Sequence, residues 1–346
     1  MRRFLLIALL LIASLLSACF PKSPVTLTVM THDSFAVSAD VVAAFEQANN
    51  IKVVFLKSGD AGAALNKAIL TKDAPIADVF YGVDNTFLSR ALDAGIFEPY
   101  DSPLLANVPA GFQLDTQRRA LPVDYGDVCL NYDKAWFAAH ILPVPAALED
   151  LRKPEYNGLL VVENPATSSP GLAFLLATIA KYGDPGYLDY WTSLRDNGLV
   201  VVDDWNMAYY TNFSGSSGHG SQPLVLSYDS SPAAEVFYAD PPVGMAPTAA
   251  ILGSGTCFRQ IEFVGILKGT PNRALAEKFV DFMLGVQFQQ DIPLQMFMYP
   301  VNLEAHLPPV FVQWAQVADQ PAALDPATIS ANRDRWIADW TETVLR

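Results

Sequence analysis

Asp33, Asp60 and Asp84 each follow a short run that is expected to form a strand, and carboxylates placed in this way could bind a cation. In α/β sheets, ligands bind beyond the carboxyl ends of the strands. A carboxylate beside a bound cation offsets the hydration that the cation loses. Asp33 could instead only cap the following helix. No two acidic residues stand out as an acid–base pair, so the pattern indicates binding rather than catalysis.

Two aromatic residues and two serines could complete such a site. Trp205 follows a short expected strand in a polar stretch, and Tyr228 ends another strand. They could line a ligand site beyond these strand ends, or they could simply pack in the core. Ser168 and Ser169 precede an expected helix, which they could cap.

Several catalytic and nucleotide-binding motifs are absent from the sequence. It contains no G-x-x-x-x-G-K-[ST] loop, no G-x-S-x-G elbow and no H-E-x-x-H pair, and its four histidines lie far apart. The formal net charge of −14, from 22 Lys and Arg against 36 Asp and Glu, argues against a nucleic-acid partner. We therefore expect no metal site, no cofactor and no enzyme activity.

The N-terminus has the pattern of an export signal. A basic start precedes the apolar run 4–16, which is shorter than a membrane-spanning helix requires. The string LSAC at 16–19 resembles the lipobox of bacterial lipoproteins, in which the cysteine carries the lipid. We expect a signal peptide over 1–18, a lipid on Cys19 and a tether over 19–25. The protein would then lie in the periplasm or on the outer face of the cytoplasmic membrane, held only by this anchor. A plain signal peptide and a buried apolar element are the alternatives.

Export places the two other cysteines in an oxidising compartment, where disulfides persist. Cys129 and Cys257 each lie in a strand-like run. They could form one bridge or remain two independent buried thiols, because the sequence does not fix the pairing.

Strand and helix patterns alternate in two parts of the chain and predict an α/β protein. Their short connections predict a parallel sheet with helices on both faces. The run 258–267 is long and apolar enough to cross between the two halves. We expect strands over 26–30, 51–55, 77–81, 159–163, 199–202 and 224–228, and helices over 61–71, 85–94, 171–182 and 274–284.

Several local strings resemble the thiamine-binding proteins of bacterial ABC importers. They include LTVMTHDSF at 27–35, PVDYG at 122–126, LSYDSSP at 226–232 and MYPV at 298–301. The resemblance covers about 26–342. It implies a two-lobed periplasmic-binding-protein fold of type II, in which two crossing strands form a hinge. The implied boundaries are 26–124 plus 260–299 for lobe 1 and 125–259 plus 300–346 for lobe 2.

The resemblance also implies a function. The chain would be a monomeric receptor, not an enzyme, that captures thiamine, its phosphates or a related pyrimidine in the cleft by hinge closure. It would deliver the ligand to an ABC permease, which is coupled to an ATPase subunit. The cleft residues would be His32, Asp33, Asp60, Asp84, Tyr125, Ser168, Ser169, Trp205, Tyr209, Tyr228 and Phe297.

Individual roles follow from the same resemblance. Trp205 and Tyr228 would form aromatic walls around the thiamine rings, and Asp33 would lie near the cation. His32 and Phe297 stand where the family commonly has Tyr and Trp. Each change weakens an aromatic wall and leaves room for an altered ligand.

Two alternatives use other residues. A ferric-ion-binding protein of the same fold would use His32 with the tandem Tyr209 and Tyr210, since imidazole and phenolate suit Fe(III). A thiamine-degrading enzyme on this scaffold would need a nucleophile in the cleft, and Cys129 is the candidate for it.

Overall fold

The computed structural model describes residues 24–215 and 220–346. The expected signal peptide and Cys19 lie outside these residues. Within them, the strands form one 11-stranded sheet with the order β2-β1-β3-β10-β5-β8-β6-β7, and β4, β9 and β11 pair beside this path. No helix in the described part of the chain is long and apolar enough to cross a membrane.

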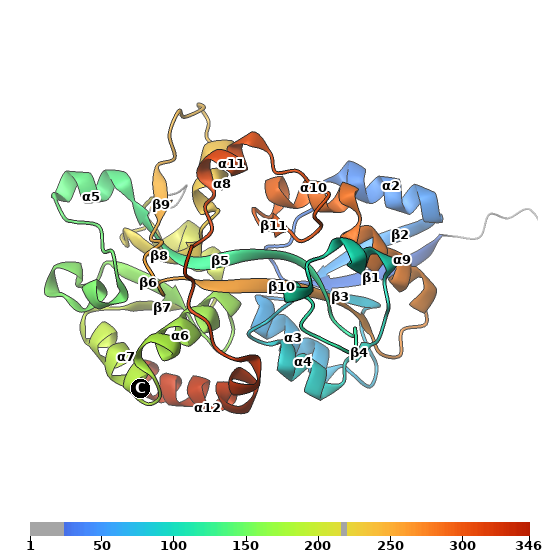
Figure 1. Ribbon diagram of the computed structural model, residues 1–346, viewed down its shortest axis with the longest axis horizontal. Coiled ribbons are helices and arrows are strands. Elements are labelled where there is room, and N and C mark those ends of the chain that lie inside the picture. The colour runs from blue at the N-terminus through green and yellow to red at the C-terminus, as the bar shows by residue number, and fades with distance from the viewer. Residues whose placement is uncertain (1–23, 216–219) are drawn as a thin grey trace, which may run out of the picture.

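The first half of the sheet is parallel, as the sequence predicts. Its strands are β1 (Val25–Thr31), β2 (Ile51–Lys57) and β3 (Val79–Asp84). Leu27 and Val29 of β1 pack against one face of the sheet and Met30 against the other, so both faces are covered. Figure 1 shows α2 and α10 on one side and α3 and α4 on the other. The helices of this half are α2 (Ala39–Asn49), α3 (Ala61–Leu70), α4 (Leu88–Ala94), α9 (Arg273–Leu284) and α10 (Val286–Gln295).

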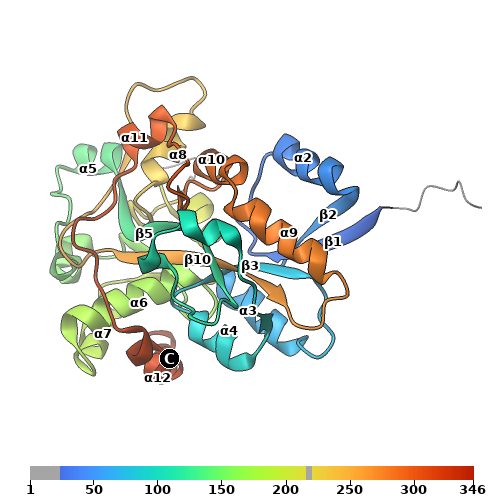
Figure 2. The ribbon, with the colours of Figure 1, turned by 45° about the vertical axis from the view of Figure 1, so that its right-hand side comes forward.

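The second half repeats the parallel arrangement around three further strands. They are β6 (Leu160–Glu163), β7 (Val200–Val202) and β8 (Leu224–Tyr228). Figure 1 shows these strands with α6, α7 and α12 below them and α5, α8 and α11 above them, and Figure 2 shows the same two groups of helices from another side. The helices are α5 (Lys134–His140), α6 (Ser169–Tyr182), α7 (Gly186–Asp196), α8 (Ser231–Phe237), α11 (Pro309–Trp314) and α12 (Pro326–Leu345).

Two long strands, β5 (Leu121–Asp133) and β10 (Phe258–Leu267), connect the halves and lie side by side across the molecule (Figure 1). They pair antiparallel with each other, β10 pairs antiparallel with β3, and β5 does so with β8. The parallel pairing that the β-α units predicted is therefore present within each half but not at the centre of the sheet. The reason is that β5 carries the chain out of the first half and β10 carries it back. The short strands beside them are β4 (Phe97–Glu98), β9 (Thr248–Ala250) and β11 (Tyr299–Pro300).

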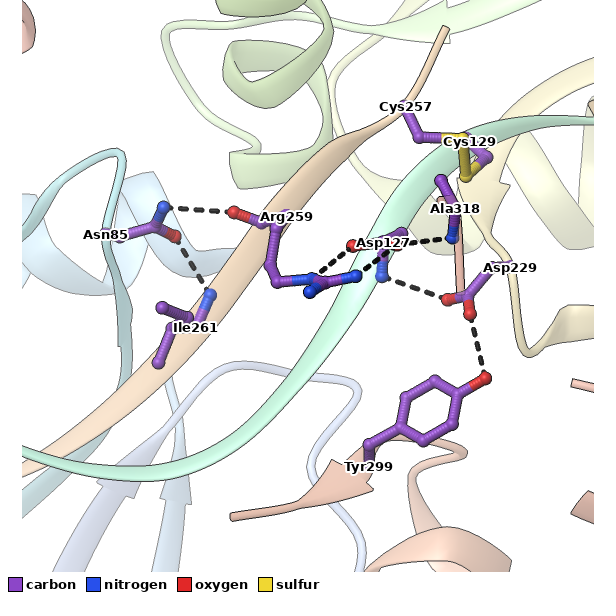
Figure 3. Close-up of polar contacts among 9 residues, drawn as sticks. All are labelled: Asn85, Asp127, Cys129, Asp229, Cys257, Arg259, Ile261, Tyr299 and Ala318. Atoms are coloured by element: carbon purple, nitrogen blue, oxygen red, sulfur yellow. Dashed lines mark hydrogen bonds and ion pairs between the residues drawn. A yellow bond between two sulfur atoms is a disulfide. The ribbon is translucent and has the colours of Figure 1, made fainter. Parts of the chain in front are cut away.

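A disulfide joins Cys129 of β5 to Cys257, the residue before β10 (Figure 3). The bridge that the sequence left open is thus confirmed. Both cysteines are fully buried. Because the sulfur of Cys129 is bonded to Cys257, it is not available as the thiolate nucleophile that the degrading-enzyme alternative requires.

Beside the disulfide, Arg259 of β10 and Asp127 of β5 belong to a polar network that also includes Asp229 and Tyr299 (Figure 3). Arg259 makes two contacts with the buried carboxylate of Asp127, from Nε at 2.8 Å and from Nη2 at 2.9 Å. The amide of Asp127 donates to Asp229 Oδ1, and the Tyr299 hydroxyl donates to Asp229 Oδ2, each at 2.9 Å. Bidentate Arg–carboxylate pairs fix orientation strongly, so this network holds the register of the two crossing strands.

Candidate functional site

A cavity of about 830 Å³ lies where the two halves of the sheet face each other across β10. This volume suits a small organic ligand. Its lining comes from the residues after β1 and β8, from the first turns of α3, α6 and α8, and from the segment before β11. Among the residues predicted for the cleft, the lining includes His32, Asp60, Ser169, Trp205, Tyr209, Tyr228 and Phe297.

One wall carries the carboxylate of Glu262, which sequence reasoning missed. Its Oε1 lies 3.4 Å from Nε2 of His32, and its Oε2 accepts a hydrogen bond from the hydroxyl of Tyr81 at 2.9 Å. The same hydroxyl lies 2.5 Å from Oδ2 of Asp124. A phenol has one proton to donate, so a second proton must be shared within this group. Burial, and then the charge of Glu262, raise the pKa of Asp124 well above its usual range. This shift favours Asp124 as the group that carries the second proton, and Glu262 is the acidic residue of the three that lines the cavity.

Asp60 is the N-cap residue of α3 and also forms a hydrogen bond with the opposite half of the protein. Its Oδ1 accepts from the amide of Ala61 at 2.8 Å, which caps the helix, and its Oδ2 accepts from the amide of Trp205 at 3.3 Å. Desolvation raises the pKa of Asp60, and the hydroxyl of Ser168 acts against that rise. This carboxylate thus connects the two walls of the cavity.

Trp205 lies on the second wall with its ring held from two sides. Its Nε1 donates to Ser227 Oγ at 2.9 Å, and its ring stacks on that of Tyr209 at 5.0 Å between centroids with 15° between the planes. Asp204 accepts from the amide of Met207 and starts the π-helical turn Met207–Asn212 that carries Tyr209. The indole is therefore oriented before any ligand arrives.

Tyr228 ends β8 and is positioned through β10. Its hydroxyl donates to Gln260 Oε1 at 3.1 Å, and Gln260 Nε2 donates to Ser169 Oγ at 3.3 Å. Gln260 and Glu262 face the cavity together because alternate residues of a strand share one face. Two polar residues at alternate positions of the largely apolar string FRQIEFVGIL were the sequence signal that could have revealed them.

Phe297 forms an apolar part of the lining. Its backbone φ of 56° is in the left-handed region, and its ring lies 5.6 Å from Tyr238 and 5.9 Å from Phe237. Tyr238 is largely exposed at the mouth of the cavity. The aromatic surface therefore continues outward from the site.

Four predicted residues do not line the cavity. Asp33 is exposed, and its Oδ1 accepts from the amide of Gly59 at 2.9 Å, so it joins the loops that follow β1 and β2. Asp84 is fully buried, and burial raises its pKa to about 6. Ser168 is also fully buried, and Tyr125 stacks between Phe112 and Tyr299 on the hinge.

The residues proposed for iron are arranged for other contacts. The hydroxyl of Tyr209 donates to Glu235 Oε1 at 2.8 Å. Burial raises the pKa of Tyr209 well above its usual value, which opposes the phenolate that Fe(III) requires. The described residues contain no cluster of three His, Cys, Asp or Glu side chains placed to hold a metal ion.

Comparison with known proteins agrees with this geometry. The model of the family described as bacterial extracellular solute-binding protein matches residues 74–320. The chain belongs to this family, whose members serve ABC importers, and it has their two-lobed α/β fold of type II.

Individual relatives have names that are more specific than the family description. The thiamine-binding periplasmic protein of Escherichia coli (strain K12) is 32% identical over 92% of this chain and 94% of its own length. The protein of the same name from Haemophilus influenzae is 26% identical over 95% of this chain and 96% of its own length. A solved structure titled periplasmic thiamin binding protein has a TM-score of 0.82 and 29% identity, covering 94% of this chain and 98% of its own.

An iron-bound protein, HitA from Pseudomonas aeruginosa, is a more distant neighbour. Its TM-score is 0.73 at 21% identity, covering 92% of this chain and 99% of its own. At this identity the likeness shows the shared fold alone.

Proposed function

We propose that this protein is an exported receptor that captures thiamine in the cavity and delivers it to an ABC permease coupled to an ATPase. The observation that carries the proposal is the pairing of oriented aromatic faces, Trp205 and Tyr228, with the carboxylate of Glu262 in one cavity. Relatives that match this chain over nearly their whole length are named as thiamine-binding proteins, which supports the same ligand.

The charge and the flat rings of thiamine match the residues that line the cavity. Thiamine combines a fixed positive charge with two flat rings. A cation over an aromatic face gains about 0.5–2 kcal/mol, more when water is excluded. Glu262 offsets the hydration that the charge loses on entry. Trp205 and Tyr209 lie on one side of the cavity and His32 on the other, so both rings of the ligand have partners.

Binding and release require the cavity to open. We place the motion at β5 and β10, with lobes formed by 26–124 plus 260–299 and by 125–259 plus 300–346. The ligand favours the closed form because it contacts both walls. The proposal also includes export through the signal peptide 1–18 and anchoring through a lipid on Cys19. The protein would act as a monomer.

Isothermal titration of the purified protein tests the assignment. We expect thiamine to bind with one site per chain and Fe(III) to give no saturable heat. A protein that binds Fe(III) and develops a visible tyrosinate band, but gives no heat with thiamine, would refute the proposal in favour of iron.

A further inference from the structure

The C-terminal helix α12 is fixed to the second half of the molecule. The ring of Trp340 meets that of Trp191 on α7 edge to face, with 5.4 Å between the centroids. The indole of Trp336 donates to Asp184 Oδ2, just before α7, at 2.9 Å. All three tryptophans are buried. Because of these contacts, α12 must move together with α7 and the second half.

The segment that leads into α12 crosses the two strands that connect the halves. Figure 1 shows it running from α11 past β5 and β10 to α12. The amide of Ala318 donates to Asp127 Oδ2, and the amide of Ala322 donates to the backbone oxygen of Cys257, each at 2.7 Å. The C-terminal segment is therefore held at the hinge on its way to α12.

Helix α12 also contacts the first half of the molecule, through the guanidinium of Arg333. This side chain is only 4% exposed, and its Nη1 donates to Ser89 Oγ of α4 at 3.0 Å. Its Nε donates to Oδ1 of Asp334, the next residue of the same helix, at 3.0 Å. Neither Arg333 nor Ser89 lines the cavity. Arg333 thus joins the two halves at a place outside the proposed ligand site.

The contact between Arg333 and Ser89 occurs in the same arrangement of the halves in which the cavity walls are joined. Across the cavity, Asp60 accepts from the amide of Trp205. A buried donor that loses its acceptor costs free energy, and the cost is larger when the donor is charged. The closed arrangement therefore depends on an acceptor for Arg333 as well as on the cavity lining.

We propose that Arg333 is a positioning residue that favours the closed form of the cavity by donating to Ser89. This inference rests on the proposed function and adds to it a contact outside the cavity that sets ligand affinity. When the halves move apart, α4 leaves α12 and water hydrates the guanidinium, so loss of the Ser89 hydroxyl destabilises the closed form alone. A ligand that binds the closed form binds more weakly when that form is less populated.

Ser89→Ala tests the contact without changing the cavity lining. Calorimetry should show thiamine binding weakened by about threefold or more, and stopped-flow fluorescence should show faster release with little change in association. Ser193→Ala is the matched control, because that hydroxyl donates to the backbone oxygen of Asp189 within α7. Unchanged affinity and release in Ser89→Ala, even with a lower melting temperature, would leave the contact a structural role only and overturn the inference.

A double-mutant cycle tests whether Arg333 acts through Ser89. Arg333→Gln removes the guanidinium and should also weaken thiamine binding. Adding Ser89→Ala to it should weaken binding no further, because the shared contact is already lost, and melting temperatures confirm that the variants are folded. Additive losses would overturn the assignment to this pair.

The wild type separates this inference from the proposed function. Failure of the wild type to bind thiamine would overturn the proposed function and, with it, the inference. Tight binding by the wild type with no effect of Ser89→Ala would overturn the inference alone.

Discussion

The amide of Trp205 donates a hydrogen bond to Oδ2 of Asp60 across the cavity, at 3.3 Å. A second contact lies beside it, because the amide of Ala63 in α3 donates to the backbone oxygen of Thr167 at 3.3 Å. The residues that line the cavity are thus also among those that join its two walls. Ligand capture and closure are therefore coupled through the same side chains.

Trp205 should carry much of the affinity. Replacing it with Ala removes a ring face that is oriented by Ser227 and Tyr209, and we expect thiamine to bind more weakly by about tenfold or more. Titration calorimetry measures this loss. Trp136→Ala on α5 is the matched control, because that ring stacks on His140 away from the cavity. Equal losses in the two variants would exclude a specific role for Trp205.

Thiamine affinity should rise with pH. Desolvation raises the pKa of Asp60, so this lining carboxyl remains partly protonated above the usual range for aspartate. A bound cation favours the ionised form, and linkage requires tighter binding as that proton leaves. Calorimetry between pH 5 and pH 8, compared with Asp60→Asn, isolates the effect, since any titration of the ligand is common to both proteins. A variant with the same pH dependence as the wild type would contradict this role.

The free energy of unfolding should fall as pH rises, whereas thiamine affinity should increase. Burial raises the pKa of Asp229 to about 7 and that of Asp84 to about 6. The folded state therefore binds protons that the unfolded state has released, and this stabilisation is complete below the unfolded pKa near 4. It is lost as pH rises through about 6 and 7.

Urea unfolding at pH 5 and pH 8 measures this dependence. We expect the free energy of unfolding to fall by about 1–3 kcal/mol across the range. Asp229→Asn keeps the shape of the group beside Tyr299 but cannot ionise, so it should reduce the fall. A steeper fall in that variant would show that the sign is wrong.

The disulfide should stabilise the hinge region. Cys129 and Cys257 close a long loop, with a sequence separation of 128. Replacing both with Ser should lower the free energy of unfolding by about 2–5 kcal/mol. Urea titrations of the oxidised wild type and of the double variant give the difference, and reduction of the wild type should reproduce it. Identical midpoints and slopes would mean that the bridge does not stabilise the fold.

Local patterns predicted much of the fold. The strand expected over 258–267 has the same bounds as β10, and the paired β-α units predicted the parallel halves. The antiparallel centre was not predicted, because strand direction depends on how the chain returns between halves rather than on residue type. Helices such as α7 and α8 were also missed.

The sequence predicted only part of the cavity lining, because side-chain direction, like strand direction, depends on the folded structure. Trp205 and Tyr228 lie at strand ends and were found there, whereas Glu262 lies in the middle of an apolar strand. Asp33 has the expected position in sequence, but its side chain accepts a hydrogen bond from Gly59, in the loop after β2, and does not line the cavity. Which carboxylate faces the ligand depends on side-chain direction, and the sequence carries little information about that.

The choice between Glu262 and Asp33 is the sharpest test of cation capture. Thiamine and its neutral pyrimidine half should be titrated into Glu262→Gln and Asp33→Asn. Glu262→Gln should weaken thiamine by about tenfold or more and the neutral half far less, while Asp33→Asn should match the wild type for both. Equal losses of both ligands in Glu262→Gln, or full thiamine affinity in that variant, would refute the binding of a cation by this carboxylate.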